Sequence, residues 1–452
     1  ILENSQNQYA QFVASNALES IMSKFWKTFT IEQKVELRNY IFNYLGTRPF
    51  INTIVLDSLI RLICKITKLG WFDSQEHREI INDVSKFLES SIEHHIIGLK
   101  LLNSLVQEMN IQSEKLTLTQ HRKAAVSFRD NALYPAYQLS LDTLKKIVAG
   151  QVDPNQAEAM TLCALNLSTS CLSFDFIGTN PEESGEDMGT VQVPTTWRPI
   201  VQDTSTMQLY FQFYQATSPP SSPLALKSLV QLSSVRRSLF ENETGRMEFL
   251  NAMITGILHI MKTWEGLNNE KNYHEFCRLI GRLKTSYQLS ELVRVPNFTE
   301  WITCSRDFSL RTLEAWDTQR NSIHYCLALW SRMVVALPYL RNDDRTPSNG
   351  IPIQTLKSCC STVATAYVQT MLNSVETVVN DGAEDPLDDE ESVRDALDRL
   401  PVIARLQYDT ISNYLNTEFQ QMLGLYSQLI TWQPQQRKQN TDQIAIIQGK
   451  LT

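Results

Sequence analysis

Apolar residues recur every three or four positions in one segment after another of this 452-residue chain. Within residues 51–69 the apolar side chains share one helical face and the charged ones share the opposite face. This period predicts amphipathic helices. Alternating strand patterns are almost absent, and Thr190 to Val193 is the main exception. Glycine (15) and proline (16) are sparse for this length, so long helices are allowed. The sequence therefore predicts an all-α protein.

The predicted helices follow one another with short turns between them. We expect helices near residues 5–26, 31–45, 49–69, 75–90, 92–109, 119–128, 131–149, 154–173, 203–216, 222–239, 243–263, 270–286, 296–316, 321–340, 351–380, 389–414, 415–432 and 440–452. Helix pairs that recur every ~40–47 residues are typical of HEAT or armadillo arrays. We therefore predict an α-α superhelix, with residues 1–452 as one continuous solenoid. An irregular all-α bundle is the alternative.

The acidic residues are concentrated in two segments, although the formal net charge is only −8. One acidic segment, residues 381–391, has no base and seven acids: Asp381, Glu384, Asp385, Asp388, Asp389, Glu390 and Glu391. The other has four acids: Glu182, Glu183, Glu186 and Asp187. Without these eleven, 38 acids face 41 bases, so the body of the chain is nearly neutral. A dedicated nucleic-acid binder is usually basic, so nucleic acid is an unlikely partner.

No segment reads as a membrane span or a signal peptide. The best candidate span, residues 51–69, carries four charges, whereas a spanning helix needs ~20 mostly apolar residues. The first residues lack a basic region and an initiator Met, and the last ones stop inside an apolar pattern, so we expect a piece of a longer protein. The eight cysteines are scattered without a CxxC pair, which predicts reduced thiols in a cytosolic or nuclear protein.

No catalytic or cofactor motif is present in the sequence. There is no GxGxxG, no P-loop and no GxSxG elbow. His274 and Cys277 could share a helical face, but no second ligand pair lies nearby, so we predict no metal site. We therefore expect a binding protein with neither catalytic residues nor a cofactor.

Two segments are candidates for binding. In the acidic segment, like charges repel and a basic partner would relieve the repulsion, while Gly382 and Pro386 keep the segment out of a helix. The alternatives are a solvated linker or favourable charge at the start of the helix near Asp389. The second segment is a long insertion at residues 174–200, which could project from the array or pack along it through Phe176 and Trp197.

Several longer blocks resemble the family of exportin-7 (Ran-binding protein 16) and Ran-binding protein 17, of the importin-β superfamily. They run in order along the chain: ITKLGWFD (residues 66–73), HRKAAVSFRDNAL (121–133), FDFIGTNPEESGEDMGTVQVPTTWR (174–198), SVRRSLF (234–240), NYHEFCRLIGRLKTSYQLSELV (272–293) and DGAEDPLDD (381–389). The resemblance implies the N-terminal part of a longer array of HEAT repeats, without its earliest repeat and its C-terminal half.

The resemblance also implies a function and partners. A family member is a nuclear export receptor that binds folded protein cargo together with Ran in its GTP form, contacts nucleoporins at the pore, and shuttles between nucleus and cytoplasm. An acidic loop of such arrays often contacts a basic surface of Ran, and the first repeats contact its switch regions. The polar residues of the first helices are then candidates for Ran contact, although a solvated face is the simpler interpretation: Arg38, Asp57, Arg61, Lys65 and Lys68.

Other functions remain open from the sequence. An import or bidirectional receptor of the same superfamily is one alternative, and an import receptor would lose its cargo when Ran·GTP binds. A static HEAT scaffold is another, and Ran·GTP would have no effect on it. An RNA-carrying receptor would need a basic concave stripe, which the nearly neutral body disfavours.

Overall fold

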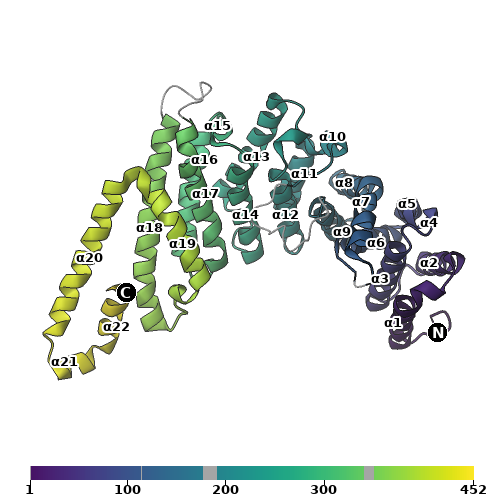
Figure 1. The fold of residues 1–452 in the computed structure, drawn as a ribbon, viewed down its shortest axis with the longest axis horizontal. Coiled ribbons are helices and arrows are strands. Elements are labelled where there is room, and N and C mark those ends of the chain that lie inside the picture. The colour runs from purple at the N-terminus through teal and green to yellow at the C-terminus, as the bar shows by residue number, and fades with distance from the viewer. Residues whose placement is uncertain (1, 114, 177–190, 341–350, 452) are drawn as a thin grey trace. The chain divides into compact units, whose positions relative to one another are not determined.

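The computed structural model describes residues 2–113, 115–176, 191–340 and 351–451. In these ranges the regular structure is helical, as predicted, apart from an isolated parallel bridge between Val191 and Val235. The chain divides into two compact units, Ile1–Leu239 (unit 1) and Phe240–Thr452 (unit 2). Each unit is an array of helices stacked on their neighbours (Figure 1).

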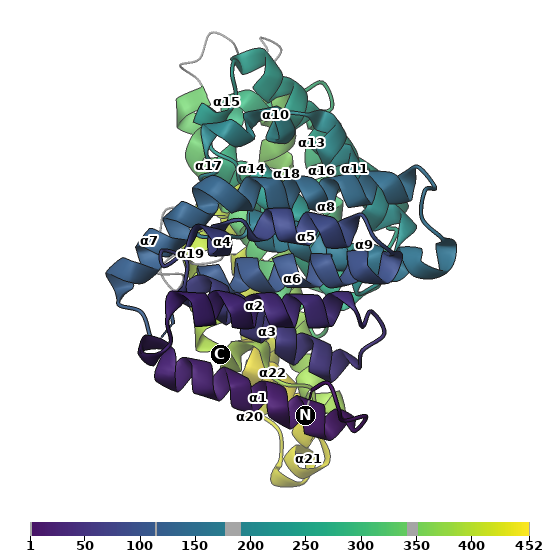
Figure 2. The same ribbon diagram turned by 90° about the vertical axis from the view of Figure 1, so that its right-hand side faces the viewer.

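Unit 1 stacks helix pairs side by side. Its helices are α1 (Gln8–Phe25), α2 (Ile31–Gly46), α3 (Thr53–Leu69), α4 (Gln75–Arg78), α5 (Ile80–Leu88), α6 (Ile92–Asn110), α7 (Leu118–Phe128), α8 (Tyr134–Val148), α9 (Pro154–Leu172), α10 (Arg198–Val201), α11 (Thr204–Ala216) and α12 (Ser221–Ser233). One row runs α1, α3, α6, α9, α12, and each helix packs on the next. A second row covers it, with α2 on α3, α5 on α6, α8 on α9 and α11 on α12. Figure 2 looks across this stack.

Polar contacts between neighbouring pairs repeat at a nearly constant spacing. Arg38 bonds to Asp83, 45 residues later, and Nε2 of His94 lies 2.9 Å from the carbonyl oxygen of Gly46, 48 residues earlier. His95 contacts Thr143, also 48 residues away. A spacing of this size is that of helix-pair repeats, so unit 1 is a repeat solenoid.

Unit 2 is built on the same plan. Its helices are α13 (Glu243–Thr263), α14 (Glu270–Ser286), α15 (Leu289–Leu292), α16 (Phe298–Glu314), α17 (Arg320–Leu340), α18 (Ile351–Asp381), α19 (Glu390–Ala404), α20 (Tyr408–Ile430), α21 (Pro434–Gln439) and α22 (Thr441–Leu451). One row runs α14, α17, α19 and the other α13, α16, α18, and α20 and α22 pack on α18. Among the described helices only α17 is long and apolar enough to cross a membrane, but it is half buried between α14 and α19, as expected of a core helix.

Local signals explain several helix boundaries. Thr30 and Gln33 form a capping box at the start of α2, because the Thr30 hydroxyl accepts from the Gln33 N–H while the Gln33 side chain accepts from the Thr30 N–H. The predicted start of the next helix at Pro49 was wrong, since α3 begins at Thr53 with Asn52 as its N-cap. The eight cysteines are all free thiols, and six of them are buried.

The predicted division of residues 389–432 was also wrong. We expected a break near residue 414, but α20 runs unbroken from Tyr408 to Ile430 and the break lies at Arg405–Gln407. Pro401 lies just upstream, inside α19, where it removes one helical hydrogen bond and crowds the preceding turn. Two further predicted helices were too long: 222–239 ends as a helix at Ser233, and 75–90 divides at Glu79.

Candidate partner-binding surfaces

The acidic segment leaves the helical array between α18 and α19. Helix α18 ends at Asp381, and Gly382 follows with a φ of +68°, a conformation that side chains other than glycine rarely adopt. A single 3₁₀ turn spans Pro386–Asp388, and α19 begins at Glu390. The prediction that Gly382 and Pro386 keep the segment out of a helix therefore holds for residues 382–385 and Asp389, whereas Asp381, Glu390 and Glu391 lie in α18 and α19.

Two acids of this segment accept hydrogen bonds from residues close to them in the sequence. The Asp385 carboxylate accepts a hydrogen bond from the Leu387 N–H at 2.9 Å. The Asp389 carboxylate caps α19, because it accepts from the backbone N–H of Ser392 at 3.3 Å and from its hydroxyl at 2.7 Å. The hydroxyl of Ser392 and then its N–H lower the pKa of Asp389. These two carboxylates therefore stabilise the local backbone as hydrogen-bond acceptors.

A third acid is tied to the preceding repeat. Arg320, the first residue of α17, places Nη1 3.2 Å from Oε2 of Glu384, and its Nη2 donates to the Glu384 carbonyl at 3.2 Å. This contact joins residues 64 positions apart, so no local sequence pattern predicts it.

Four acids of the segment remain open to solvent. Asp381, Asp388, Glu390 and Glu391 are exposed and form no ion pair with any residue that the structure describes. Glu390 and Glu391 lie in the first turn of α19, where the helix dipole favours negative charge. The segment thus combines a tied backbone with a cluster of free carboxylates, and such a cluster attracts a basic surface.

The polar residues predicted on the first helices separate into two groups. Asp57 and Arg61 are exposed on α3, and an oxygen of Asp57 lies 3.7 Å from Nζ of Lys100 on α6. Lys65 is half-buried and pairs with Glu19 of α1. These three could contact a partner on the face where α1, α3 and α6 lie side by side.

Arg38 and Lys68, in contrast, are buried, so the prediction that they lie on an open polar face was wrong. Arg38 is 1% exposed and donates to Asp83 at 2.7 Å and to Asn39 at 2.8 Å. Lys68 is 2% exposed, and its ammonium group donates to the carbonyl oxygens of Glu108 and Ile111. Burial lowers the pKa of Lys68. Both side chains join neighbouring repeats, which helical periodicity alone does not predict.

The predicted insertion is only partly within the described residues. Glu182, Glu183, Glu186 and Asp187 lie outside them. Trp197 is 1% exposed, stacks on Tyr137 with ring centroids 5.1 Å apart, and meets Phe176 edge-on at 5.5 Å. The two ends of the insertion therefore pack into the core of unit 1, and Trp197 is not available to a partner.

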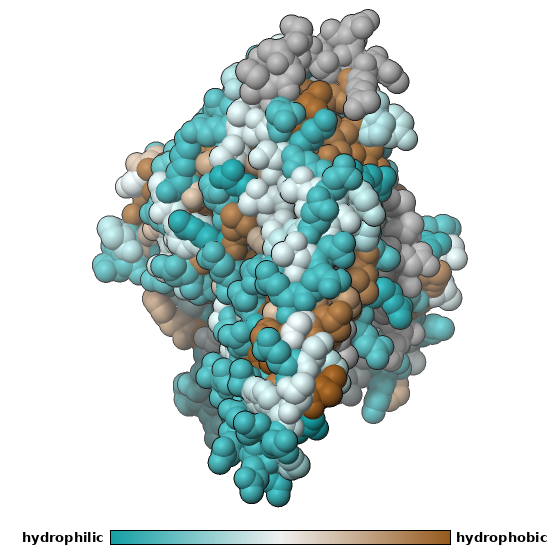
Figure 3. All heavy atoms as spheres, turned by 90° about the vertical axis from the view of Figure 1, so that its left-hand side faces the viewer, coloured by the Kyte–Doolittle hydropathy of each residue, from teal (hydrophilic) through white to brown (hydrophobic). Residues whose placement is uncertain are grey.

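Helix α20 exposes an apolar face that sequence analysis did not single out. Five large apolar side chains are exposed along one sector of about 80°, taking 100° per residue: Tyr408, Leu415, Phe419, Leu423 and Ile430. Figure 3 views unit 2 from the side of α20, where apolar residues lie among polar ones. Contiguous exposed apolar faces are typical of contact surfaces.

A family profile for part of a known protein matches the end of the chain. The profile is described as "Exportin-7-like, TPR domain", and it matches residues 374–452. This range contains the acidic segment and helices α19, α20, α21 and α22. TPR repeats, like HEAT repeats, are stacked helix pairs, in agreement with the arrangement of unit 2.

Curated relatives match all or nearly all of the chain. Exportin-7-A of Xenopus laevis is 39% identical over 459 aligned residues, which cover 100% of this chain and 41% of the relative. Ran-binding protein 17 of Homo sapiens is 38% identical over 95% of this chain and 39% of its own length. Ran-binding protein 16 of Drosophila melanogaster is 37% identical, again over 95% of this chain and 39% of its own length. The chain thus spans about two fifths of the length of these relatives.

Proposed function

Because this chain belongs to the family of exportin-7 and Ran-binding proteins 16 and 17, we propose that it is part of a nuclear export receptor. The receptor would bind folded protein cargo together with Ran in its GTP form and carry the cargo through the nuclear pore. The observation that supports this most is the identity of 39% to an exportin across all of the chain. The names of the relatives describe an exportin and Ran-binding proteins, none of them an enzyme.

The physical mechanism of such a receptor would be linkage between two binding events. In a repeat array each helix pair contacts only its neighbours, so the array bends easily. If Ran·GTP and cargo favour the same curvature, each raises the affinity of the other, typically by a coupling of ~1–3 kcal/mol. GTP hydrolysis by Ran would then remove the coupling and release the cargo. The chemistry would belong to Ran, and this chain would supply only surfaces.

The acidic segment is the proposed contact for a basic surface of Ran. Its four free carboxylates, on Asp381, Asp388, Glu390 and Glu391, are exposed, and the Arg320 contact at Glu384 and the Asp389 cap tie the backbone among them. A backbone ordered before binding loses less entropy on binding. Asp57, Arg61 and Lys65 on α3 are the proposed contacts in unit 1 for the Ran switch regions.

A binding measurement with Ran in two nucleotide states tests the function. Immobilised Ran, loaded with GTP or GDP, is exposed to the complete protein that contains these residues. An exportin binds the GTP form far better than the GDP form when cargo is present. Equal binding to both forms would favour a static scaffold, and cargo release by Ran·GTP would favour an import receptor. Movement between nucleus and cytoplasm, through contact with nucleoporins, is part of the proposal.

A charge-matched pair of variants tests the acidic segment. In the first, Asp381, Asp388, Glu390 and Glu391 are replaced by Asn or Gln. In the control, four exposed acids elsewhere are replaced by Gln: Glu36, Glu158, Glu248 and Glu314. Only the first variant should lose affinity for Ran·GTP, and the loss should shrink with added salt because the Debye length is only about 10 Å at 0.1 M. An equal effect of the two variants at low salt would exclude the acidic segment as the contact.

A further inference from the structure

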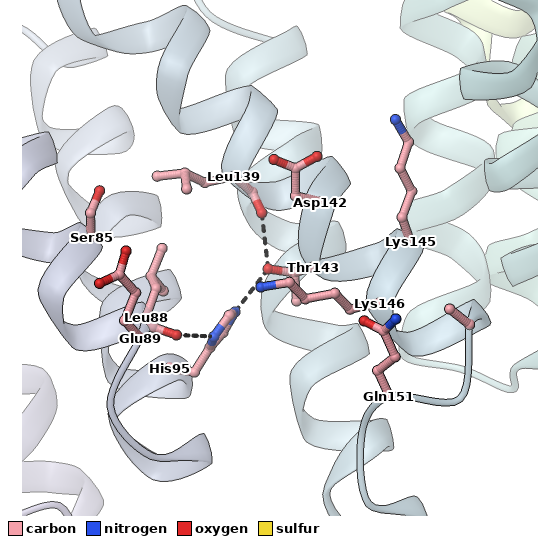
Figure 4. A pocket seen from close by; sticks show the side chains of 11 residues that line it. Ser85, Leu88, Glu89, His95, Leu139, Asp142, Thr143, Lys145, Lys146 and Gln151 are labelled. Atoms are coloured by element: carbon pink, nitrogen blue, oxygen red, sulfur yellow. Dashed lines mark hydrogen bonds between the residues drawn. The ribbon is translucent and has the colours of Figure 1, made fainter.

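A cleft opens in unit 1 where α5 and α8 both end. It has a volume of about 470 Å³, within the range of ligand pockets. Its lining comes from the last turn of α5, from His95 on α6, and from α8 and the turn after it. Figure 4 shows these side chains around His95 and Thr143. None of them belongs to the candidate surfaces described above.

The polar groups on the floor of the cleft bond to one another and to backbone carbonyl groups. His95 places Nδ1 2.9 Å from the carbonyl oxygen of Leu88 and Nε2 2.8 Å from the hydroxyl oxygen of Thr143. Burial lowers the pKa of His95, so the ring is neutral near pH 7. The Leu88 oxygen can only accept, so we assign the ring proton to Nδ1. Oγ1 of Thr143 also lies 2.9 Å from the Leu139 carbonyl oxygen, so its single proton is donated either to that oxygen or to Nε2 of His95. Recognition of a ligand therefore depends mainly on residues of the walls and the rim.

The walls of the cleft offer an apolar slot. Leu88, at the end of α5, and Leu139, on α8, are both half-buried and line it from different repeats, and Ala149 is exposed at its end. An apolar side chain placed between the two leucines would remove their exposed surface from water, at roughly 25 cal/mol per Å². The slot thus fits an aliphatic or aromatic side chain.

The rim carries charges of both signs that have no ion pair within the described part of the chain. Lys146 points across the cleft toward Thr143, whereas Lys145 points away from it (Figure 4). Burial is the main cause of the lowered pKa of His95, and the charge of Lys146 adds to it. Glu89 and Asp142 are exposed on the rim. Glu89 directly follows α5, whose carbonyl end favours a positive charge, and Asp142 lies on α8. The cleft can therefore pair with one carboxylate and, farther out, with one base.

We propose that this cleft binds an extended peptide segment in which an apolar residue adjoins an acidic one and a basic residue lies nearby. The apolar side chain enters between Leu88 and Leu139, the carboxylate pairs with Lys146, and the basic side chain reaches Glu89 or Asp142. Glu89 and Asp142 repel a run of several acids, so the cleft selects mixed charge over net acidity. It adds recognition of a linear segment to the proposed binding of folded partners and does not depend on the proposed transport function.

Fluorescence anisotropy tests the site without Ran. The probe is a short fluorescein-labelled peptide of Gly and Ser that contains one Leu-Glu pair and one Lys. We expect saturable binding to the wild-type chain. Lys146→Glu should weaken it by about tenfold, the equivalent of 1.4 kcal/mol. Ala149→Trp should also weaken it, because the indole fills the end of the cleft at an exposed position that the core does not use. Lys123→Glu, exposed on α7 outside the cleft, is the control of equal charge change.

A charge-swapped peptide separates recognition from a structural effect. A probe with a Leu-Lys pair and one Glu should bind Lys146→Glu better than it binds the wild-type chain. Restored binding of this kind requires a direct contact between residue 146 and the peptide, since a partly unfolded variant would bind neither peptide. Absence of saturable wild-type binding up to millimolar concentration would overturn the proposal, as would either cleft variant binding the first probe as tightly as the wild type. Neither result would alter the Ran measurement.

Discussion

Arg246 and Glu291 form a buried ion pair that joins α13 to α15 in unit 2. The two side chains are 2% and 6% exposed, with Nε of Arg246 2.7 Å from Oε1 of Glu291. Arg246 also donates to the Ser286 carbonyl and lies over the Tyr287 ring. Arg246→Leu leaves the buried Glu291 carboxylate without its cationic partner, bonded to the Gln288 N–H, so we expect a loss of about 3–5 kcal/mol in the free energy of unfolding. Urea unfolding measures it.

The matched control for this pair is an exposed one. Lys86 is 79% exposed beside Asp83, so Lys86→Ala should leave the unfolding midpoint nearly unchanged. The double variant Arg246→Leu, Glu291→Leu should recover much of the loss, because no charge then remains buried. Arg246→Leu as stable as the wild type would contradict the assigned role.

His77 makes the stability of unit 1 depend on pH. It is fully buried, and burial, then the charges of Arg38 and Lys34 against an opposing Asp73, lower its pKa to about 4. Its ordinary value is 6.5, so between pH 6.5 and 4 the unfolded chain binds more protons. The contribution of His77 to the free energy of unfolding is therefore fully present above pH 6.5. It is lost as the pH drops toward 4, by up to about 3 kcal/mol. Urea unfolding at several pH values should show a shallower fall for His77→Gln, and equal slopes would contradict the prediction.

Sequence patterns predicted the apolar core better than the polar residues that join the repeats. Helical spacing placed Val55, Leu59 and Leu62 on the buried face of α3, and all three are fully buried. The same spacing placed Lys68 on the polar face, yet its long side chain reaches carbonyl groups on α6 and just beyond it, 40 and 43 residues away. A partner that distant leaves no trace in a local period, so such residues cannot be recognised before the repeats are stacked.

At the scale of helices, Asp389 fixes where α19 begins. Asp389→Ala removes the acceptor for the N–H and hydroxyl of Ser392, so the first turn of α19 should fray. Hydrogen exchange should then show faster exchange of the amides of residues 391–393. Asp388→Asn is the control, because Asp388 is exposed and caps nothing within the described chain. Equal exchange in the two variants would contradict the role of Asp389 as a cap.

Substitutions on the buried face of helix α20 should lower the free energy of unfolding more than substitutions on its exposed face. Leu429 is 6% exposed, so Leu429→Ala should lower the free energy of unfolding of residues 1–452 by about 2 kcal/mol or more. Phe419 is 52% exposed, and Phe419→Ala should change it far less. Thermal unfolding of the two variants side by side measures the difference. A larger loss for Phe419→Ala would mean that this face is covered.

Helix existence was predictable for most of the chain, whereas breaks inside long apolar patterns were not. Thr30 and Gln33 indicate the start of α2, because a capping box is formed by residues close together in the sequence. The break at Arg405–Gln407 has no glycine, and Pro401 within α19 is the only nearby signal. The cleft above His95 was not predictable, since it forms where the ends of α5 and α8 meet around a residue of α6.

Across the molecule, polar contacts between neighbouring helix pairs recur at a regular spacing in the sequence. Such a regular array is the physical basis of the proposed coupling between two binding sites. In unit 2, Arg246 and Glu291 are 45 residues apart, and Arg332 donates to Thr285 over 47 residues, much as Arg38 bonds to Asp83 over 45 residues in unit 1. Each contact joins adjacent helix pairs, so bending is spread over many similar junctions. That residues 1–452 form one continuous solenoid remains a prediction.

The sign of the coupling between Ran·GTP and cargo decides among the proposed functions. Both partners would bind the same curved form of the array, so saturating Ran·GTP should tighten cargo binding by about 5–150-fold in the complete protein. By reciprocity, cargo should tighten Ran·GTP binding by the same factor, which gives an internal check from two independent titrations. Isothermal titration in both orders, with Ran·GDP as the control, measures both factors. An import receptor gives a factor below one and a scaffold gives no change, so either result would exclude the export mechanism, whereas unequal factors would mean that the titrations had not reached equilibrium.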